Sequence, residues 1–158
     1  MPQAARPPRV ELRPAAALRS VNPHGWPQPK GYANGMTGRG RLVFVAGQIG
    51  WTEAQVLATD DFVGQLEQAL YNTVAVLAAA DARPEHIARM TWYITDKHEY
   101  LARLPEIGRI WRDTLGRHFP AMAVVQVVAL VEDGAKIEIE TTALVPEQDD
   151  CFADRDGH

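Results

Sequence analysis

The chain has 158 residues, of which 46% are hydrophobic, and it carries a formal net charge of −4. This length is typical of a single domain, and the apolar content is sufficient for a hydrophobic core. The acidic balance argues against a nucleic-acid partner, because proteins that bind nucleic acids usually carry a basic surface. No stretch approaches the roughly 18 apolar residues of a membrane-spanning helix, so we expect no membrane partner.

The single cysteine, Cys151, lies in the polar stretch EQDDCFADRDGH. One cysteine cannot build an internal disulfide framework, and this usage is typical of a reducing compartment. Residues 1–9 lack the apolar segment of a signal peptide. We therefore expect a cytoplasmic protein.

The chain divides into three parts by composition. We predict a flexible N-terminal extension over residues 1–19, one folded domain over residues 20–146 and a flexible C-terminal tail over residues 147–158. The first clear element of the domain is RLVFVAGQIGW at 41–51, a β-rich apolar run that ends on glycines. This pattern predicts a buried strand.

Two helices and a further strand are predicted in the middle of the chain. Asp60 and Asp61 precede FVGQLEQALYNTVAVLAAA, where apolar residues recur at helical spacing. This pattern predicts an amphipathic helix with an aspartate N-cap. Residues 87–95 form another β-rich run, and residues 97–119 again show helical spacing. Within the second helix, Pro105 marks either the first turn or a break.

The segment HFPAMAVVQVVALVEDGAKIEIETTALV at 118–145 is expected to form an antiparallel hairpin, whose turn contains an Asp-Gly dipeptide. Side chains of a strand alternate between its two faces. Ile137 and Ile139 therefore share one face of the second strand, and Glu138 and Glu140 share the other. This alternation puts Met122 and Glu138 on faces that could share a cleft.

Two further short strands are expected before residue 41, one of them VELRP at 10–14, which Pro14 ends. The resulting order β-β-β-α-β-α-β-β predicts an α+β fold of two layers. We expect a mixed six-stranded sheet with two helices packed on one face. Both faces of the first hairpin strand are largely apolar between Met122 and Ala129. Two helices can cover only one face of the sheet, so we expect another subunit to cover the second face.

Several ordered motifs resemble the Rid/YjgF family: PKGYANGM, VFVAGQIG, TWYITD, and FPA followed by KIEIE. The founding members of that family are enamine and imine deaminases, and many relatives carry the older label L-PSP endoribonuclease. The resemblance covers about residues 20–146. It implies a chorismate-mutase-like fold, a homotrimer and a small-molecule ligand in a cleft between subunits. We expect no metal and no other cofactor.

The resemblance also implies four site residues. The glutamate that handles water in the family corresponds to Glu138, which we predict to be catalytic. The tyrosine of the family's GPY loop corresponds to Tyr32. The arginine that follows Phe-Pro-Ala and binds the substrate carboxylate is replaced by Met122, and a frequent cysteine two residues later is replaced by Val124. Tyr32, Met122 and Val124 are predicted to bind substrate.

The replacement of arginine by Met122 changes the expected substrate. Arginine binds a carboxylate through two parallel hydrogen bonds and stays charged, whereas methionine provides only a soft apolar wall. A charge-assisted contact of this kind contributes about 1.5–3 kcal/mol. The standard amino-acid-derived imines should therefore bind poorly. We expect a more apolar substrate, or one whose carboxylate partner lies elsewhere, with Lys30, His24 and Arg41 as candidates.

Structural alternatives stand beside each role. Glu138 could lie on a solvated strand face or form a salt bridge between subunits, Tyr32 could pack within its loop, and Met122 could belong to the core.

Three candidate functions follow from these observations. The first is a deaminase or hydrolase acting on an imine, an enamine or a related compound. The second is a non-catalytic ligand-binding or regulatory homotrimer. The third is an endoribonuclease, ranked last because no basic and aromatic stripe is evident.

Overall fold

The computed structural model describes residues 18–147 of the chain. Nearly all of the expected N-terminal extension and C-terminal tail, including Cys151, lies outside these residues. The described part contains six strands, three α-helices and one 3₁₀ turn. None of the helices in this part is long and apolar enough to cross a membrane.

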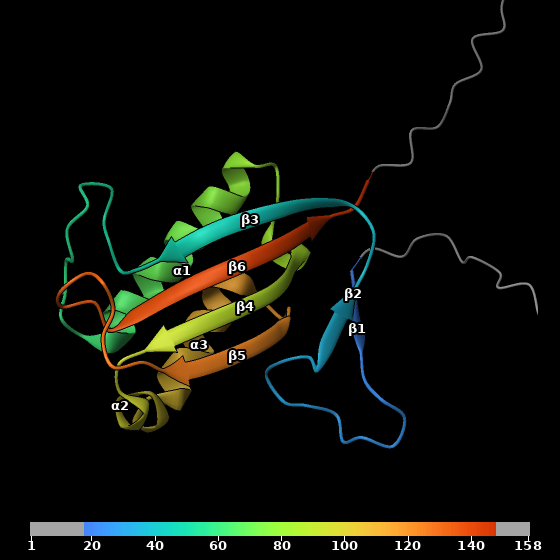
Figure 1. Ribbon diagram of the computed structural model, residues 1–158, viewed down its shortest axis with the longest axis horizontal. Coiled ribbons are helices and arrows are strands. Elements are labelled where there is room, and N and C mark those ends of the chain that lie inside the picture. Colours follow the sequence, from blue (N-terminus) through green and yellow to red (C-terminus); the bar gives the residue numbers. More distant parts are fainter. Residues whose placement is uncertain (1–17, 148–158) are drawn as a thin grey trace, which may run out of the picture.

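Four strands form the main sheet, in the order β3-β6-β4-β5 (Figure 1). Their bounds are β3 Arg41–Gln48, β4 Ile87–Ile94, β5 Ala121–Gln126 and β6 Ile137–Val145. Strand β6 is antiparallel to both of its neighbours, whereas β4 and β5 are parallel. The other two strands, β1 and β2, form a separate antiparallel pair. The six strands are thus divided between a sheet of four and a pair, whose bounds are Arg19–Val21 and Gly35–Thr37.

The expected hairpin over residues 118–145 is wrong in one respect, because β5 and β6 are not neighbours. Strand β4 lies between them in the sheet. The connection from β5 to β6 passes the end of β4, where Val127 donates its backbone N–H to Ile94 O at 2.8 Å. Thr95 then donates to Lys136 O at 3.1 Å. Alternating apolar residues and a turn dipeptide are expected both for two neighbouring strands and for two strands with a third between them. The sequence pattern therefore could not distinguish these two arrangements.

Helix α1 (Phe62–Ala79) begins as predicted. The Asp61 carboxylate accepts a hydrogen bond from the backbone N–H of Gly64 at 3.0 Å, which satisfies one of the free donors of the first turn. The apolar positions of the helix face the sheet, and the residues buried there are Phe62, Val63, Gln65, Leu66, Ala69, Leu70, Thr73 and Leu77.

The single helix expected over residues 97–119 is wrong, because this segment forms two helices. They are α2 (Lys97–Ala102) and α3 (Leu104–Leu115), and Arg103 lies between them. Pro105 occupies the first turn of α3. Backbone N–H groups in the first turn have no acceptor within the helix, so the missing N–H of proline costs no hydrogen bond there. Gly116 ends α3 at a φ of 71°, a left-handed conformation that favours glycine.

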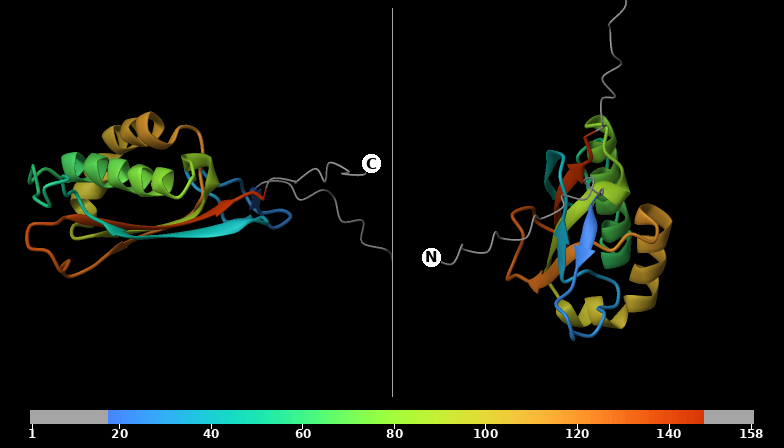
Figure 2. Two further views of the ribbon diagram at one scale, coloured as in Figure 1. Left: turned by 90° about the horizontal axis from the view of Figure 1, so that it is seen from above. Right: turned by 90° about the vertical axis from the view of Figure 1, so that its right-hand side faces the viewer.

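The helices lie on one face of the sheet, and the opposite face is open within the described part of the chain (Figure 2). The two-layer α+β arrangement is therefore confirmed. The core between the layers includes Trp92, Ile137 and Ile139, each at most 1% exposed. The open face presents large apolar side chains to solvent, namely Leu42, Phe44 and Val125, which are 55%, 73% and 41% exposed.

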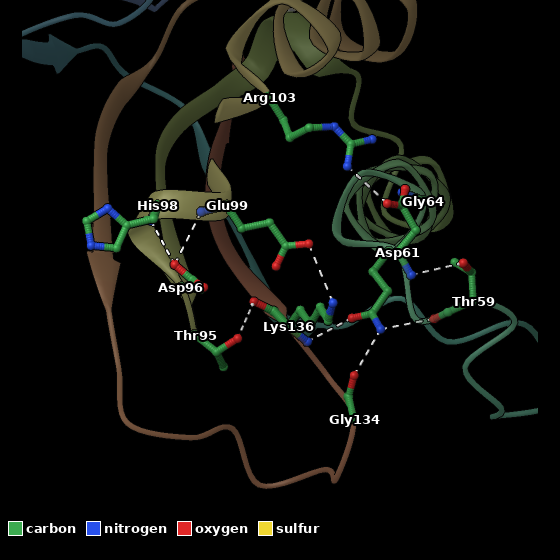
Figure 3. A network of polar contacts seen from close by, with 11 residues as sticks. Thr59, Asp61, Gly64, Thr95, Asp96, His98, Glu99, Arg103, Gly134 and Lys136 are labelled. Carbon is green, nitrogen blue, oxygen red and sulfur yellow. Dashed lines mark hydrogen bonds and ion pairs between the residues drawn. The ribbon is translucent and has the colours of Figure 1, made fainter. Parts of the chain in front are cut away.

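A polar network joins the start of α1, the α2 region and the end of the β5–β6 connection (Figure 3). At its centre is Gln65, whose side-chain amide is fully buried. The amide nitrogen donates to Thr59 O at 3.0 Å and to Gly134 O at 2.9 Å, and the amide oxygen accepts from Lys136 N at 2.8 Å. Arg103 adds an ion pair to Asp61 at 3.1 Å. The network therefore fixes the long connection that precedes β6.

Acid should weaken this network. The hydrogen bond from the Gly64 N–H and the neighbouring Arg103 guanidinium lower the pKa of Asp61. A carboxylate whose pKa is lower in the folded state stabilises the fold above its unfolded pKa of about 4, and this contribution is lost as the pH falls further. We expect the melting temperature of Asp61→Asn to fall less between pH 5 and pH 2.5 than that of the unmodified protein. Thermal unfolding across this range measures the difference.

The matched control is Asp60→Asn, which changes the adjacent carboxylate. Among the described residues, Asp60 forms no side-chain hydrogen bond or ion pair of its own, so its removal should leave the acid dependence unchanged. Equal flattening in both variants would contradict the role assigned to the Asp61 contacts.

Candidate active site

The principal cavity has a volume of about 780 Å³ and lies between α3, the helix-covered side of β4 and β5, and the loop before β2. This volume is within the range of small-molecule sites. Three of the predicted site residues line it together: Tyr32, Met122 and Val124. We therefore treat this cavity as the candidate site.

Strand β5 brings Met122 and Val124 into the cavity. It is an edge strand, and it pairs with β4 so that Met122 lies opposite Met90 and Val124 opposite Trp92. Both partners are buried in the core, so the two β5 side chains point to the helix-covered face. Met122 and Val124 are half-buried, and they form an apolar floor.

Tyr32 reaches the same cavity from the loop before β2. Ala33 forms a parallel bridge to Ala121 and donates its backbone N–H to Pro120 O at 2.9 Å, which fixes the loop beside the start of β5. Gly31 has a φ of 78° and turns the chain before Tyr32. The Tyr32 side chain is 44% exposed, so it stands at the rim of the cavity.

Aromatic rings form one wall of the cavity. Trp111 lies between Trp92, with ring centroids 5.8 Å apart, and Phe119, at 6.1 Å and nearly parallel. Trp111 also donates its indole N–H to His118 O at 3.1 Å. Burial raises the pKa of the Tyr100 phenol, which lines the same cavity, so this ring stays neutral at ordinary pH.

Three cations line the cavity: Lys30, Arg112 and Arg117. Lys30 was one of the three candidate carboxylate partners considered from sequence. The other two, His24 and Arg41, do not line the cavity, and Arg41 instead donates to Ala80 O at 2.9 Å.

The sequence analysis missed both arginines. Arg112 follows Trp111 on α3, so it borders the apolar face of that helix. Arg117 follows the glycine that ends the same helix. The available signal in the sequence was a cation next to an aromatic residue near the end of a predicted helix. This signal does not indicate a binding site, because the sequence alone does not show that β5 lies across the cavity from α3.

Glu138 does not line this cavity. It lies between Ile137 and Ile139 on β6, whose side chains are buried under the helices, so it points to the open face. Its cross-strand neighbour on β4 is Tyr93. Gly47 approaches from β3 so closely that a Cβ there would collide with the Glu138 carboxylate. Glu138 and the cavity are therefore on opposite faces of the sheet within one protomer.

Glu140 lies on the same open face as Glu138 and has a clear partner. The Tyr93 hydroxyl donates to the Glu140 carboxylate at 2.7 Å. This hydrogen bond raises the pKa of the Tyr93 phenol. Glu140 is thus engaged with a neighbouring strand.

The cavity provides an apolar floor, an aromatic wall and cations, and none of the described residues that line it carries a carboxylate. Within one protomer it can therefore bind and orient a ligand, without an acidic side chain to activate water. Across residues 18–147, no three His, Cys, Asp or Glu side chains are grouped so that they could hold a metal ion.

Comparisons with known proteins agree with this architecture. The family model described as Endoribonuclease L-PSP matches residues 27–145. Protein DfrA from Myxococcus xanthus is 36% identical over 110 residues, which cover 66% of this chain and 77% of DfrA. TdcF from Escherichia coli K12, which carries the name of a reactive intermediate deaminase, is 31% identical over 105 residues, covering 66% of this chain and 80% of TdcF.

Solved structures show the same fold. YyfB from Yersinia pestis, a protein of the Rid family, has a TM-score of 0.73 at 29% identity and covers 82% of this chain and 100% of its own. The structure of E. coli TdcF with bound serine has a TM-score of 0.60 at 26% identity, covering 81% of this chain and 99% of TdcF. The chain therefore belongs to the L-PSP, or Rid/YjgF, family, and the expected chorismate-mutase-like fold is confirmed.

Proposed function

We propose that this protein is a RidA-like deaminase that hydrolyses an imine, an enamine or a related small compound. The observation that supports this proposal most strongly is the cavity that gathers Tyr32, Met122 and Val124, in a chain whose relatives include a protein named as a reactive intermediate deaminase. We also propose that the protein acts in the cytoplasm.

The substrate differs from the standard amino-acid-derived imines in this proposal. Met122 occupies the floor of the cavity, where the resemblance places the anchoring arginine of deaminating relatives. It offers no hydrogen-bond donor to an α-carboxylate. The solved TdcF carries serine, an amino acid with such a carboxylate. A substrate whose reacting carbon lies against an apolar surface suits Met122 and Val124 better.

The proposed catalytic residue is Glu138, and its position requires a second copy of the chain. Glu138 and the cavity lie on opposite faces of the sheet, so one protomer supplies the cavity and another supplies Glu138. The exposed Leu42 and Phe44 on the open face support contact between copies. We propose a homotrimer with the ligand in a cleft between subunits.

The proposed reaction follows from these roles. Glu138 takes a proton from a water molecule as the water oxygen bonds to the carbon of the C=N group. The same carboxyl group returns this proton to nitrogen, which gives a carbinolamine. It then carries the hydroxyl proton of the carbinolamine to the amino nitrogen, so that the C–N bond breaks and ammonia leaves as the carbonyl product forms. One water is consumed and one ammonia is released for each imine. Tyr32, at the rim of the cavity, orients the substrate.

Ammonia release above the uncatalysed rate tests this proposal. Two imine types are compared, an imino acid and an apolar imine without an α-carboxylate. We expect the unmodified protein to prefer the apolar imine, and Glu138→Gln to lose at least about 100-fold in kcat/KM, within the usual range for acid–base catalysis. Met122→Arg should gain at least about tenfold on the imino acid, because it restores a charge-assisted contact.

The matched control is Glu140→Gln, on the same strand and the same open face. It should retain activity, because Glu140 is engaged with Tyr93 in the proposed arrangement. A protein that hydrolyses none of these imines would contradict the deaminase proposal.

One observation favours a second candidate, a non-catalytic ligand-binding homotrimer. Within residues 18–147, the cavity is lined by cations and aromatic rings but by no carboxylate. Ligand binding without ammonia release in the same experiment would support this candidate. The endoribonuclease suggested by the family's description remains third, because the chain has a net charge of −4. RNA cleavage that is lost in Glu138→Gln would support it instead.

A further inference from the structure

The charge of the candidate cavity differs from that of the chain as a whole. The chain has a formal net charge of −4, yet the charged side chains that line the cavity are Lys30, Arg112 and Arg117, all of them cations. Three positive charges, with no carboxylate among the described residues that line the cavity, favour a positive potential at its mouth. Such a site attracts an anion.

The three cations are not engaged by the protein itself. The ion pairs found across residues 18–147 involve Arg83, Arg103 and Lys136 instead. In the same part of the chain, no side-chain hydrogen bond from Lys30, Arg112 or Arg117 is formed. A ligand can therefore use their donors without breaking an existing contact.

The Arg112 side chain lies beside Gly108, one turn earlier on α3. The Arg112 Nη1 atom lies 3.5 Å from the point that a Cβ of Gly108 would occupy. The guanidinium thus lies along the helix, over the glycine that also lines the cavity. Arginine in this position can bind a carboxylate through two parallel N–H groups.

The remainder of the cavity suits a flat apolar group. Trp111 and Phe119 are nearly parallel, with an angle of 6° between their planes, and Met122 lies on the floor. Flat rings prefer stacked or edge-to-face contacts with such a wall. Trp92 also lines the cavity, so its indole N–H signal can report on a bound ligand.

We propose that the cavity binds an aromatic carboxylate, with its ring against the Trp111 and Phe119 wall and its carboxylate held by Arg112 and Arg117. Lys30, which also lines the cavity, adds a third positive charge. This inference deepens the proposed function by naming the substrate class, an aromatic acid whose carboxylate is not attached to the reacting C=N carbon. It rests on that function only for the chemistry that follows binding. The arginines would anchor the acid at a place different from Met122.

Isothermal titration calorimetry with two matched probes tests the inference. Indole-3-acetate and its neutral amide, indole-3-acetamide, share the same ring and nearly the same shape. We expect the unmodified protein to bind the acid at least tenfold more tightly than the amide. In the double variant Arg112→Gln/Arg117→Gln, this ratio should fall to less than threefold, while affinity for the amide stays nearly unchanged.

Arg109→Gln is the matched control, because Arg109 lies on the same helix, is exposed and does not line the cavity. It should leave the ratio unchanged, and melting temperatures show whether each variant is folded. In ¹⁵N-correlated NMR spectra, the acid should shift the indole N–H signal of Trp92, assigned through Trp92→Phe. Lys30→Gln should lower the ratio by a smaller factor than the double variant.

Several results would overturn the inference. They are equal binding of acid and amide, an unchanged ratio in the double variant, no binding of either probe, or displacement of the acid by an equal concentration of inorganic phosphate.

The binding inference and the deaminase proposal can fail separately. A protein that binds the acid but releases no ammonia from any imine retains this inference and loses the deaminase function. A deaminase that does not bind the acid gives the opposite result.

Discussion

Trp111→Ala is expected to lower the free energy of unfolding by about 3–5 kcal/mol, the usual range for removing a large buried aromatic side chain. Trp111 is 6% exposed and lies between the rings of Trp92 and Phe119. The substitution leaves a cavity in the core and removes the hydrogen bond from its indole N–H to His118 O, 3.1 Å long. Both effects act in the same direction.

Urea unfolding followed by circular dichroism measures this loss. The control is Trp26→Ala, because the Trp26 side chain is 60% exposed and its removal should change stability by no more than about 0.5 kcal/mol. Trp111→Phe should lie between the two, since it keeps part of the ring contact. If Trp111→Ala were as mild as Trp26→Ala, the ring would not support the wall of the candidate site.

Gln65→Met is expected to lower the free energy of unfolding by about 2–4 kcal/mol, although it keeps the length of the side chain. The methionine can fill the space but cannot replace the amide contacts to Thr59, Gly134 and Lys136. Each buried polar group left without a partner costs about 1–3 kcal/mol. The loss should be felt first in the β5–β6 connection, where amide hydrogen exchange should become faster.

Gln68→Met provides the comparison on the same helix. Gln68 is half-buried, and its side chain makes one hydrogen bond, to Asn72 at 2.9 Å. We expect a loss of no more than about 1 kcal/mol, because solvent can replace that partner. Similar losses in both variants would show that the Gln65 contacts are not what fixes the connection.

Local elements were the part of the fold that sequence predicts well. The apolar residues of α1 recur at helical spacing because one face of this helix packs on the sheet. The pattern alone therefore indicates which face of the helix is buried. Asp61 was predicted as a cap for the same reason, since capping needs only residues close in the chain. The alternation of Ile137, Glu138 and Ile139 also separated the side chains of β6 into its two faces correctly.

Neighbours in space were not predictable in the same way. The break at Arg103 and the insertion of β4 between β5 and β6 depend on packing between segments far apart in the chain. The candidate site shows the same limit. Lys30 was considered from sequence, but Arg112 and Arg117 became relevant only once α3 was placed beside β5.

The placement of Met122 and Glu138 on opposite faces of the sheet has an evolutionary consequence. Within one protomer the two side chains have different neighbours, Met90 for Met122 and Tyr93 for Glu138. Substitutions at sites that share no partners are usually additive. A lineage can therefore exchange the residue at position 122 without disturbing the packing around position 138 within the protomer, while both side chains meet the same ligand in the proposed trimer.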